Sequence, residues 1–116
     1  MDLHSQKQNR LKPFVSIVIL NYNGVKYLQQ FLPSVMATRY DNVEIVVADN
    51  GSTDNSLEVL AKEFSIVTVI TNPKNEGFAG GYNWALQKVH ADYFVLLNSD
   101  VAVEENWINP MVDLME

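Results

Sequence analysis

Short apolar runs rich in β-branched residues alternate with amphipathic helical patterns along almost the whole chain. The four runs predicted to form strands cover residues 15–20, 43–48, 66–70 and 93–97. Each is followed by apolar residues at helical spacings of three and four. Strands that alternate with helices form right-handed βαβ units, in which a parallel sheet carries helices on both faces. The sequence therefore predicts an α/β fold with a Rossmann-like parallel sheet of about four strands.

Three of these patterns make finer predictions. The run at residues 93–97 is apolar at every position, which is typical of a strand buried on both faces. A last helix is predicted over residues 104–115. The helix after the second run is predicted to begin near Asp54 or Asn55 and to have an inner face made of Leu57, Leu60, Ala61 and Phe64.

Length and charge limit the class of protein. At 116 residues the chain supports one domain, predicted at residues 13–116, behind a disordered or extended tail at residues 1–12. The net charge of -6 disfavours binding to nucleic acid or to an anionic membrane surface, and the absence of cysteine excludes thiolate chemistry. The sequence has no signal-peptide pattern and no apolar stretch of about 18 residues. We therefore expect a cytoplasmic protein.

The chain stops within a helical pattern, soon after an apolar strand and without a C-cap glycine. We therefore expect it to be a piece of a longer protein, whose remainder would cover the strand at residues 93–97. This piece alone is expected to expose an apolar patch or a sheet edge and to self-associate as a homo-oligomer.

Polar and aromatic residues stand where the predicted strands end. Tyr22, Asp49 and Asp100 each follow a strand closely, and parallel strands bring their carboxyl ends to one edge of the sheet, where ligands of open α/β sheets bind. An aromatic ring can stack on a nucleobase, while carboxylates can accept hydrogen bonds or hold a divalent cation. The glycine cluster at residues 77–81 lets backbone amides approach an anion closely. Together these features predict a nucleoside-diphosphate site.

Four blocks, residues 15–23, 46–54, 75–83 and 96–100, resemble family 2 glycosyltransferases in their order and spacing. The resemblance implies a GT-A fold whose first half binds a dTDP-, UDP- or GDP-sugar and transfers the sugar, with inversion, to a glycan or lipid-linked acceptor. It also implies that Asp100 holds Mg2+ or Mn2+ at the diphosphate, with Asp49 and Asn50 at the base and Tyr22 near its ring. The full set implied to bind the nucleotide sugar is Asn21, Tyr22, Asp49, Asn50, Gly77, Gly80, Asn83 and Asn98.

The glycine-rich block is similar to that of bacterial rhamnosyltransferase-like members, which act in polysaccharide biosynthesis. For the full-length protein this implies a cytoplasmic enzyme that can sit peripherally at the inner face of the membrane.

The chain departs from the family pattern at three points. Asn98 stands where the metal motif usually has its first aspartate, so Asp100 is the one carboxylate of that motif. Tyr82 occupies a position where many members carry an arginine. The family supplies its general base from a later segment, so we expect the catalytic base to be absent from this chain and the piece to be inactive alone. Glu104, Glu105 and Asp113 follow the metal motif too closely to be assigned that role.

Other interpretations remain open. Residues 49–54 could be a turn and a helix cap only, with Asp54 as the capping residue. The domain could be a nucleotide-sugar-binding module without catalytic activity. A dinucleotide-binding oxidoreductase domain fits less well, because the turn after the first strand has only Gly24 where a Gly-any-Gly-any-any-Gly motif is needed.

Overall fold

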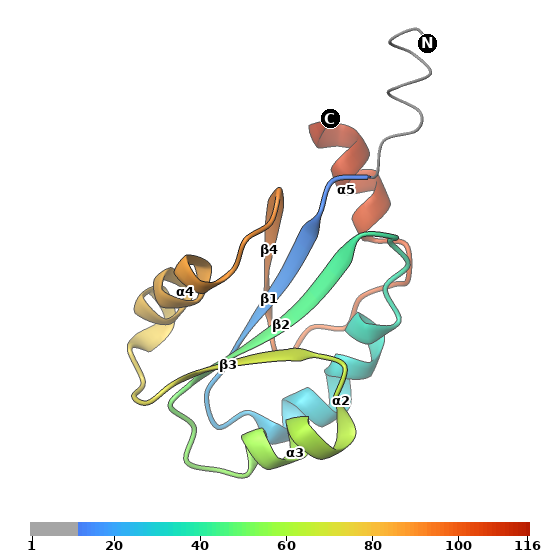
Figure 1. Ribbon diagram of the computed structural model, residues 1–116. Helices are drawn as coiled ribbons and strands as arrows, with labels where there is room; N and C mark the ends of the chain where they lie inside the picture. Colours follow the sequence, from blue (N-terminus) through green and yellow to red (C-terminus); the bar gives the residue numbers. More distant parts are fainter. Residues whose placement is uncertain (1–11) are drawn as a thin grey trace, which may run out of the picture.

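Four parallel strands form the sheet of this computed structural model, which describes residues 12–116. Their order in space is β3-β2-β1-β4, so the chain crosses over between strands through helices (Figure 1). This confirms the predicted α/β parallel sheet. The strands are β1 (Val15–Asn21), β2 (Val43–Asn50), β3 (Thr68–Asn72) and β4 (Tyr93–Asn98), and the helices are α2 (Val25–Met36), α3 (Ser56–Glu63), α4 (Gly77–Lys88) and α5 (Ile108–Met115).

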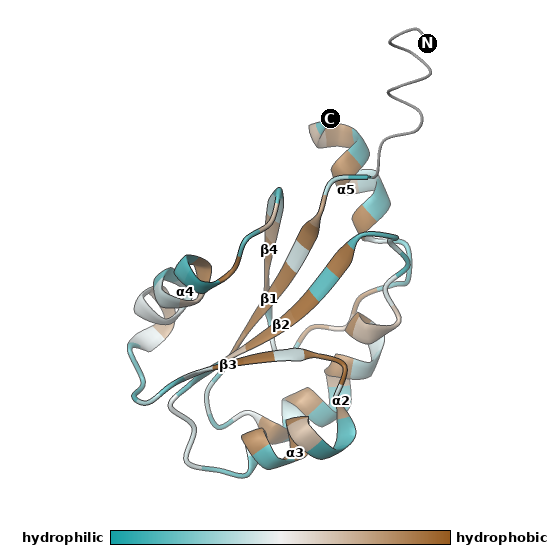
Figure 2. Cartoon of the chain, in the orientation of Figure 1, coloured by the Kyte–Doolittle hydropathy of each residue, from teal (hydrophilic) through white to brown (hydrophobic). Residues whose placement is uncertain are grey.

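The helices cover both faces of the sheet because alternate strand residues point to opposite sides. Ile17 and Ile19 of β1 pack in one apolar cluster with buried residues of α2, α3 and α5. Val18 of β1 lies in a second cluster with Tyr82 and Ala85 of α4. Figure 2 shows the apolar residues concentrated on the strands between these layers. The strand-end loops are thereby held at one edge of the sheet.

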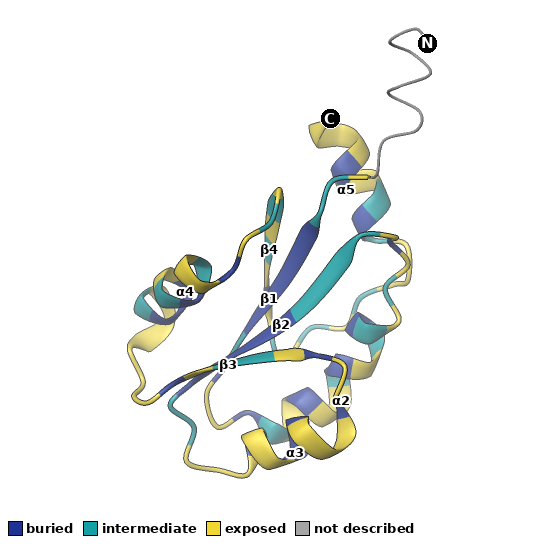
Figure 3. Ribbon diagram, in the orientation of Figure 1, coloured by how far each residue is buried: buried dark blue, intermediate teal, exposed yellow. Residues whose placement is uncertain are grey.

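The prediction that the fourth strand is buried on both faces is wrong. β4 is an edge strand that pairs only with β1 in the described sheet, and α4 packs over β1 and β2. Phe94 and Leu96, which alternate along β4, are therefore 40% and 49% exposed, whereas β1 is buried along nearly its whole length (Figure 3). The expected exposure of an apolar sheet edge is confirmed here.

Two element boundaries also differ from the predictions. β3 begins at Thr68, because residues 64–67 form a turn in which the Val67 amide donates to the Phe64 carbonyl, and Ile66 is left 80% exposed. The last helix begins at Ile108 and not at residue 104. The segment before it is held against α2 by a hydrogen bond from the Val103 amide to Ser34 Oγ, and against the loop after α2 by one from the Arg39 amide to the Glu105 carbonyl.

The inner face of α3 is only partly as predicted. Leu60 and Phe64 are buried, but Leu57 is 41% exposed and Ala61 also faces solvent, while Val59 takes a place in the core. The helix begins at Ser56, and its buried stripe runs through Ser56, Val59 and Leu60.

The predicted tail at residues 1–12 lies outside the described residues, except for Lys12, whose ammonium group donates a hydrogen bond to Asn109 Oδ1. Within residues 12–116, no helix combines the length and apolar character needed to cross a membrane.

Candidate functional site

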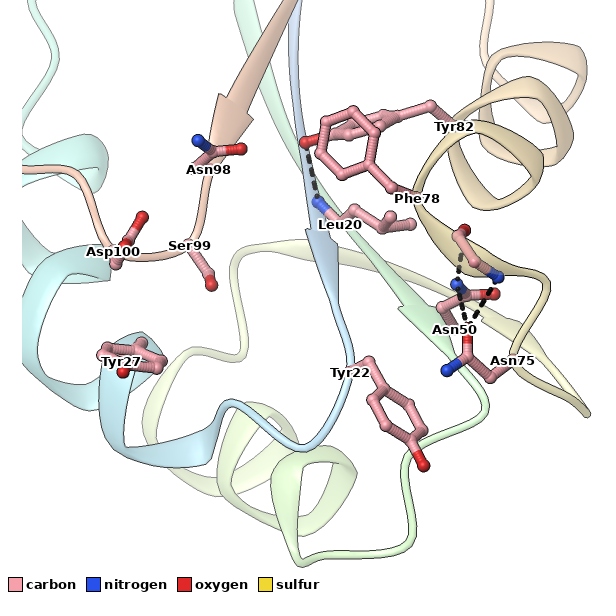
Figure 4. Close-up of a pocket in the computed structure, with 11 residues that line it drawn as sticks. Leu20, Tyr22, Tyr27, Asn50, Asn75, Phe78, Tyr82, Asn98, Ser99 and Asp100 are labelled. Carbon is pink, nitrogen blue, oxygen red and sulfur yellow. Dashed lines mark hydrogen bonds between the residues drawn. The ribbon is translucent and has the colours of Figure 1, made fainter.

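A cleft of about 430 Å³ opens at the carboxyl edge of the sheet, between the ends of β1 and β4 and the start of α4 (Figure 4). This is where ligands of open α/β sheets bind, and the volume is within the range of small-molecule sites. Its lining residues are Leu20, Tyr22, Tyr27, Asn50, Asn75, Gly77, Phe78, Tyr82, Asn98, Ser99 and Asp100.

The β4 side of the cleft presents oxygen ligands. Asn98 ends β4, and Ser99 and Asp100 follow it in a turn. Asp100 is exposed and forms no hydrogen bond or ion pair with residues 12–116. None of the described lining residues is basic, so the one formal charge in the cleft is negative. Carboxylate, amide and hydroxyl oxygens are the ligands that Mg2+ and Mn2+ prefer.

The donor set is nonetheless small. Within the described residues, no group of three or more histidine, aspartate or glutamate side chains could hold a metal ion. Asp100 can therefore supply part of a coordination shell, and a ligand or water must supply the rest.

Two exposed aromatic rings lie at the cleft, one just after β1 and one on α2 on the same side as Asp100 (Figure 4). Tyr22, just after β1, is 48% exposed, and Tyr27, in the first turn of α2, is 52% exposed. Exposed aromatic rings at a cleft can stack on planar groups of a ligand. Tyr27 was not among the predicted site residues. The sequence did contain a sign of its exposure. The buried face of α2 is formed by Leu28, Leu32 and Val35, and Tyr27 does not belong to that face.

The α4 side of the cleft is built by Asn50. Its amide nitrogen donates to Asn75 Oδ1 at 2.9 Å and to the Gly77 carbonyl at 3.1 Å, and its Oδ1 accepts the Glu76 amide at 3.1 Å. Gly77 has a φ of 75°, a conformation that glycine adopts without strain. Asn50 thus fixes the loop that begins α4 while it lines the cleft. Asn75 and Phe78, also in the lining, were missed as individual site residues.

Asp49 does not line the cleft. It is 1% exposed, and its Oδ1 accepts the Asn21 amide at 2.9 Å and the Ser52 hydroxyl at 2.7 Å, while its Oδ2 accepts the Ser52 backbone amide at 3.1 Å. Asn21, fully buried, also stays beneath the cleft surface, and its Oδ1 has no hydrogen-bond partner among the described residues. The two side chains form a buried support for the loop after β2.

Gly80 and Asn83 also lie outside the lining. Both are in α4, and a Cβ at Gly80 would meet Glu76 Cβ at 3.2 Å, so this glycine relieves crowding within the helix. Asn83 is exposed to solvent. The family resemblance implied that both residues bind the nucleotide sugar, but neither is among the residues that line the cleft.

Asp54 is not the capping residue of α3 that the capping interpretation expected, because the N-cap is Asn55; Asp54 instead closes a turn just before the helix. Its Oδ1 accepts the backbone amide of Ser56 at 2.9 Å and also the Ser56 hydroxyl, and its Oδ2 accepts the Val25 amide at 3.3 Å. Partial burial opposes ionisation, but the hydrogen bonds from Ser56 and Val25 outweigh it and lower the pKa of Asp54.

The architecture and the cleft define an open α/β domain with a cleft at the carboxyl edge of a parallel sheet, where domains of this class bind their ligands. Residues 16–116 match the family described as Glycosyl transferase family 2, and the chain belongs to this family. This confirms the family that the four sequence blocks indicate.

Relatives and solved structures agree with this assignment. An uncharacterized glycosyltransferase of Haemophilus influenzae is 31% identical over 107 residues, covering 90% of this chain and 33% of that protein. Glycosyltransferase GlyG of Streptococcus pneumoniae is 30% identical over 104 residues, covering 87% and 35%. This chain thus spans about a third of the length of these relatives.

Among solved structures, S. aureus TarS in complex with UDP-GlcNAc is similar with a TM-score of 0.77 and 23% identity, covering 88% of this chain and 31% of that chain. The mannosyltransferase PcManGT from Pyrobaculum calidifontis, in complex with GDP-Man and Mn2+, is similar with a TM-score of 0.71 and 21% identity, covering 78% and 28%. At this level of identity the two structures show a shared fold.

Proposed function

We propose that this chain is the donor-binding part of a glycosyltransferase that takes a sugar from a nucleotide-diphosphate sugar. The observation that carries the proposal is the cleft itself, in which the exposed Tyr22 ring after β1 lies across from the oxygen ligands on the β4 side (Figure 4). A nucleotide sugar has a planar base at one end and a diphosphate at the other, so its chemistry fits these two sides. Family membership supports the same reaction class.

In the proposed complex the base lies at the Tyr22 and Asn50 end. Tyr22 offers a ring for stacking, and Asn50 fixes the loop of Asn75 and Gly77 beside it. Asp49 belongs to this end as a buried support that holds Asn21 and Ser52.

The diphosphate lies at the Asp100 end with a divalent cation. The side chains of Asp100, Asn98 and Ser99 carry oxygen atoms, the type of ligand that Mg2+ and Mn2+ prefer, and all three residues line the cleft. No described lining residue is basic, so a bound cation is the group that neutralises the phosphates. The complex of PcManGT with GDP-Man and Mn2+ supports this reading. Such a cation acts as a Lewis acid on the leaving nucleoside diphosphate.

The proposal also covers the general base, the acceptor, the donor sugar and the location of the protein. Asp100 is the one carboxylate in the described lining, and the proposal gives it the role of a cation ligand. We therefore assign no residue of the described lining as the general base that deprotonates the acceptor hydroxyl. We further propose a glycan or lipid-linked acceptor, an inverting outcome, a rhamnose-type donor, and a cytoplasmic protein that can associate with the inner face of the membrane.

Calorimetry with UDP, GDP and dTDP, each with and without Mn2+, tests the proposal. We expect at least one of them to bind more tightly than about 1 mM with Mn2+ present, and more weakly without it. NAD+ serves as the matched control for an oxidoreductase domain. Binding of NAD+ together with no binding of any nucleoside diphosphate would contradict the proposal.

A further inference from the structure

Tyr82 connects α4 to the two strands that flank the cleft. It is only 5% exposed, and its hydroxyl donates to the Leu97 carbonyl of β4 at 3.1 Å and accepts the Leu20 amide of β1 at 3.4 Å. Figure 4 shows the phenol reaching from α4 to Leu20. One side chain thus bonds the backbones of two neighbouring strands.

The two backbone groups belong to the last two paired steps of the β1 and β4 ladder. Leu20 is paired with Asn98 in the parallel register, and Leu97 is paired with Ile19. A single hydroxyl can reach the amide of one strand and the carbonyl of the other only where these groups lie on the facing edges of the strands. The Tyr82 hydroxyl is therefore a clamp on the carboxyl ends of β1 and β4.

The clamped positions lead directly into the two sides of the cleft. Leu97 is followed by Asn98, Ser99 and Asp100, and Leu20 lies two residues before Tyr22. The Tyr82 hydrogen bonds therefore lie at the point where the two strands lead into the cleft. No other described side chain has a hydrogen bond to both strands at this edge.

The clamp is itself held rigidly. The Phe78 ring packs edge-on against the Tyr82 ring, with centroids 5.0 Å apart and an angle of 74° between the planes. A Cβ at Gly81 would lie 2.7 Å from Asn50 Nδ2 and 2.9 Å from Leu20 Cδ1, so a larger residue there would have to displace these two side chains. Tyr82 consequently has little freedom to move away from the strands.

We propose that Tyr82 is a positioning residue of the donor cleft, which sets the separation between Tyr22 at the base end and Asp100 at the diphosphate end. This inference rests on the proposed function. Tyr82 acts through the two strands and not by direct contact with the reacting atoms. Burial raises the pKa of Tyr82, so the hydroxyl keeps its proton and remains a donor to Leu97 at neutral pH.

The test compares Tyr82→Phe with Tyr40→Phe. Tyr40 is a matched control, because it is 7% exposed and its hydroxyl also donates to a backbone carbonyl, that of Pro13 at 2.6 Å, but it does not line the cleft. Both variants lose one buried hydroxyl, so we expect similar decreases in thermal stability. The affinity for UDP with Mn2+ is expected to fall roughly tenfold in Tyr82→Phe alone.

A second ligand separates positioning from a general loss of structure. UDP with Mn2+ spans both ends of the cleft, whereas uridine occupies the base end only. A positioning role predicts that Tyr82→Phe weakens UDP with Mn2+ much more than uridine, whereas a merely structural role weakens both equally. GDP with guanosine, or dTDP with thymidine, replaces this pair if the unchanged protein prefers another base.

Three binding results would overturn the inference. Equal binding of UDP with Mn2+ by Tyr82→Phe and the unchanged protein overturns it and leaves the proposed function standing. An equal loss of affinity for UDP with Mn2+ and for uridine in Tyr82→Phe also overturns the inference and leaves the proposed function standing. No binding of any nucleoside diphosphate by the unchanged protein overturns both proposals together. If Tyr82→Phe fails to fold, hydrogen exchange of the Leu20 amide in the unchanged protein decides: slower exchange with UDP and Mn2+ supports the clamp, and unchanged exchange overturns it.

Discussion

Asp49 and Asp100 both stand at the carboxyl edge of the sheet, yet the structure uses them in opposite ways. Asp49 near the end of β2 is 1% exposed and accepts hydrogen bonds from Asn21 and Ser52. Asp100, two residues after β4, is exposed, lines the cleft and has no such partner within residues 12–116.

The difference follows from the places of the two strands in the sheet. β2 lies between β1 and β3, so the end of β2 has neighbours on both sides, and one of them supplies Asn21. β4 is an edge strand with a neighbour on one side only. A carboxylate at an interior strand end can be satisfied by the protein, whereas one after an edge strand is left for a ligand.

The largest effect on stability is expected for Asp49→Ala. This change removes the acceptor for Asn21 and Ser52 in a buried place, which should lower the free energy of unfolding by about 3 kcal/mol. Asp100→Ala is the matched control and should leave that free energy nearly unchanged. Urea denaturation measures both, and equal effects would show that the two carboxylates do not differ in this way.

For ligand binding we expect a large effect from a change at Asp100, the carboxylate that matters little for stability. We expect Asp100→Asn to weaken the binding of UDP with Mn2+ about tenfold, because the cation loses its one carboxylate ligand. Glu104→Gln is the control, since Glu104 is exposed and close in sequence but does not line the cleft. An equal loss in Glu104→Gln, measured by calorimetry, would point to overall charge as the cause.

The edge position of β4 also predicts self-association. Phe94 and Leu96 are exposed beside an unpaired strand edge, so we expect this chain to associate with itself, and the double change Phe94→Ser with Leu96→Ser to reduce the association. Ile66→Ser is the control, because Ile66 is 80% exposed in the turn before β3. Sedimentation at several concentrations measures the change. A monomer at every concentration would contradict the prediction.

The smallest effect is expected from Asp54, in the loop after β2. The pKa of Asp54 is lowered in the folded state from its ordinary value of 3.8, so the stability that Asp54 contributes is fully present above that value and is lost as the pH falls through the lowered pKa. Asp54→Asn should therefore remove a small part of the acid sensitivity below about pH 4. The measurement is urea denaturation between neutral and acid pH. Identical pH profiles for the variant and the unchanged protein would contradict the role of Asp54.

Much of the fold follows from local pattern. β1 and β2 are rich in β-branched residues and are followed by turn residues, and such runs predict buried parallel strands from the chain alone. The boundary of β3 was misplaced, because Ile66 belongs to a strand-like run but lies in a turn formed with Phe64. A local pattern cannot report a turn that depends on where the preceding helix ends.

The site residues that follow strands could be predicted from the sequence, whereas those on helices could not. Tyr22, Asn98 and Asp100 were predicted and line the cleft, since a parallel sheet gathers such residues at one edge. Tyr27 and Phe78 line it too but were missed, because each stands in a helix where exposure depends on how that helix lies on the sheet. The binding roles of all these residues stay predictions.

The sequence by itself determined the α/β class, the parallel sheet and the edge at which the cleft opens, because these follow from periodicity and from the polar residues at strand ends. Only the tertiary structure decided that Asp49 is buried and Asp100 is exposed, and that Tyr82 bonds both β1 and β4. Which strand becomes an edge depends on pairings between segments far apart in the chain, and a local pattern carries no information about them.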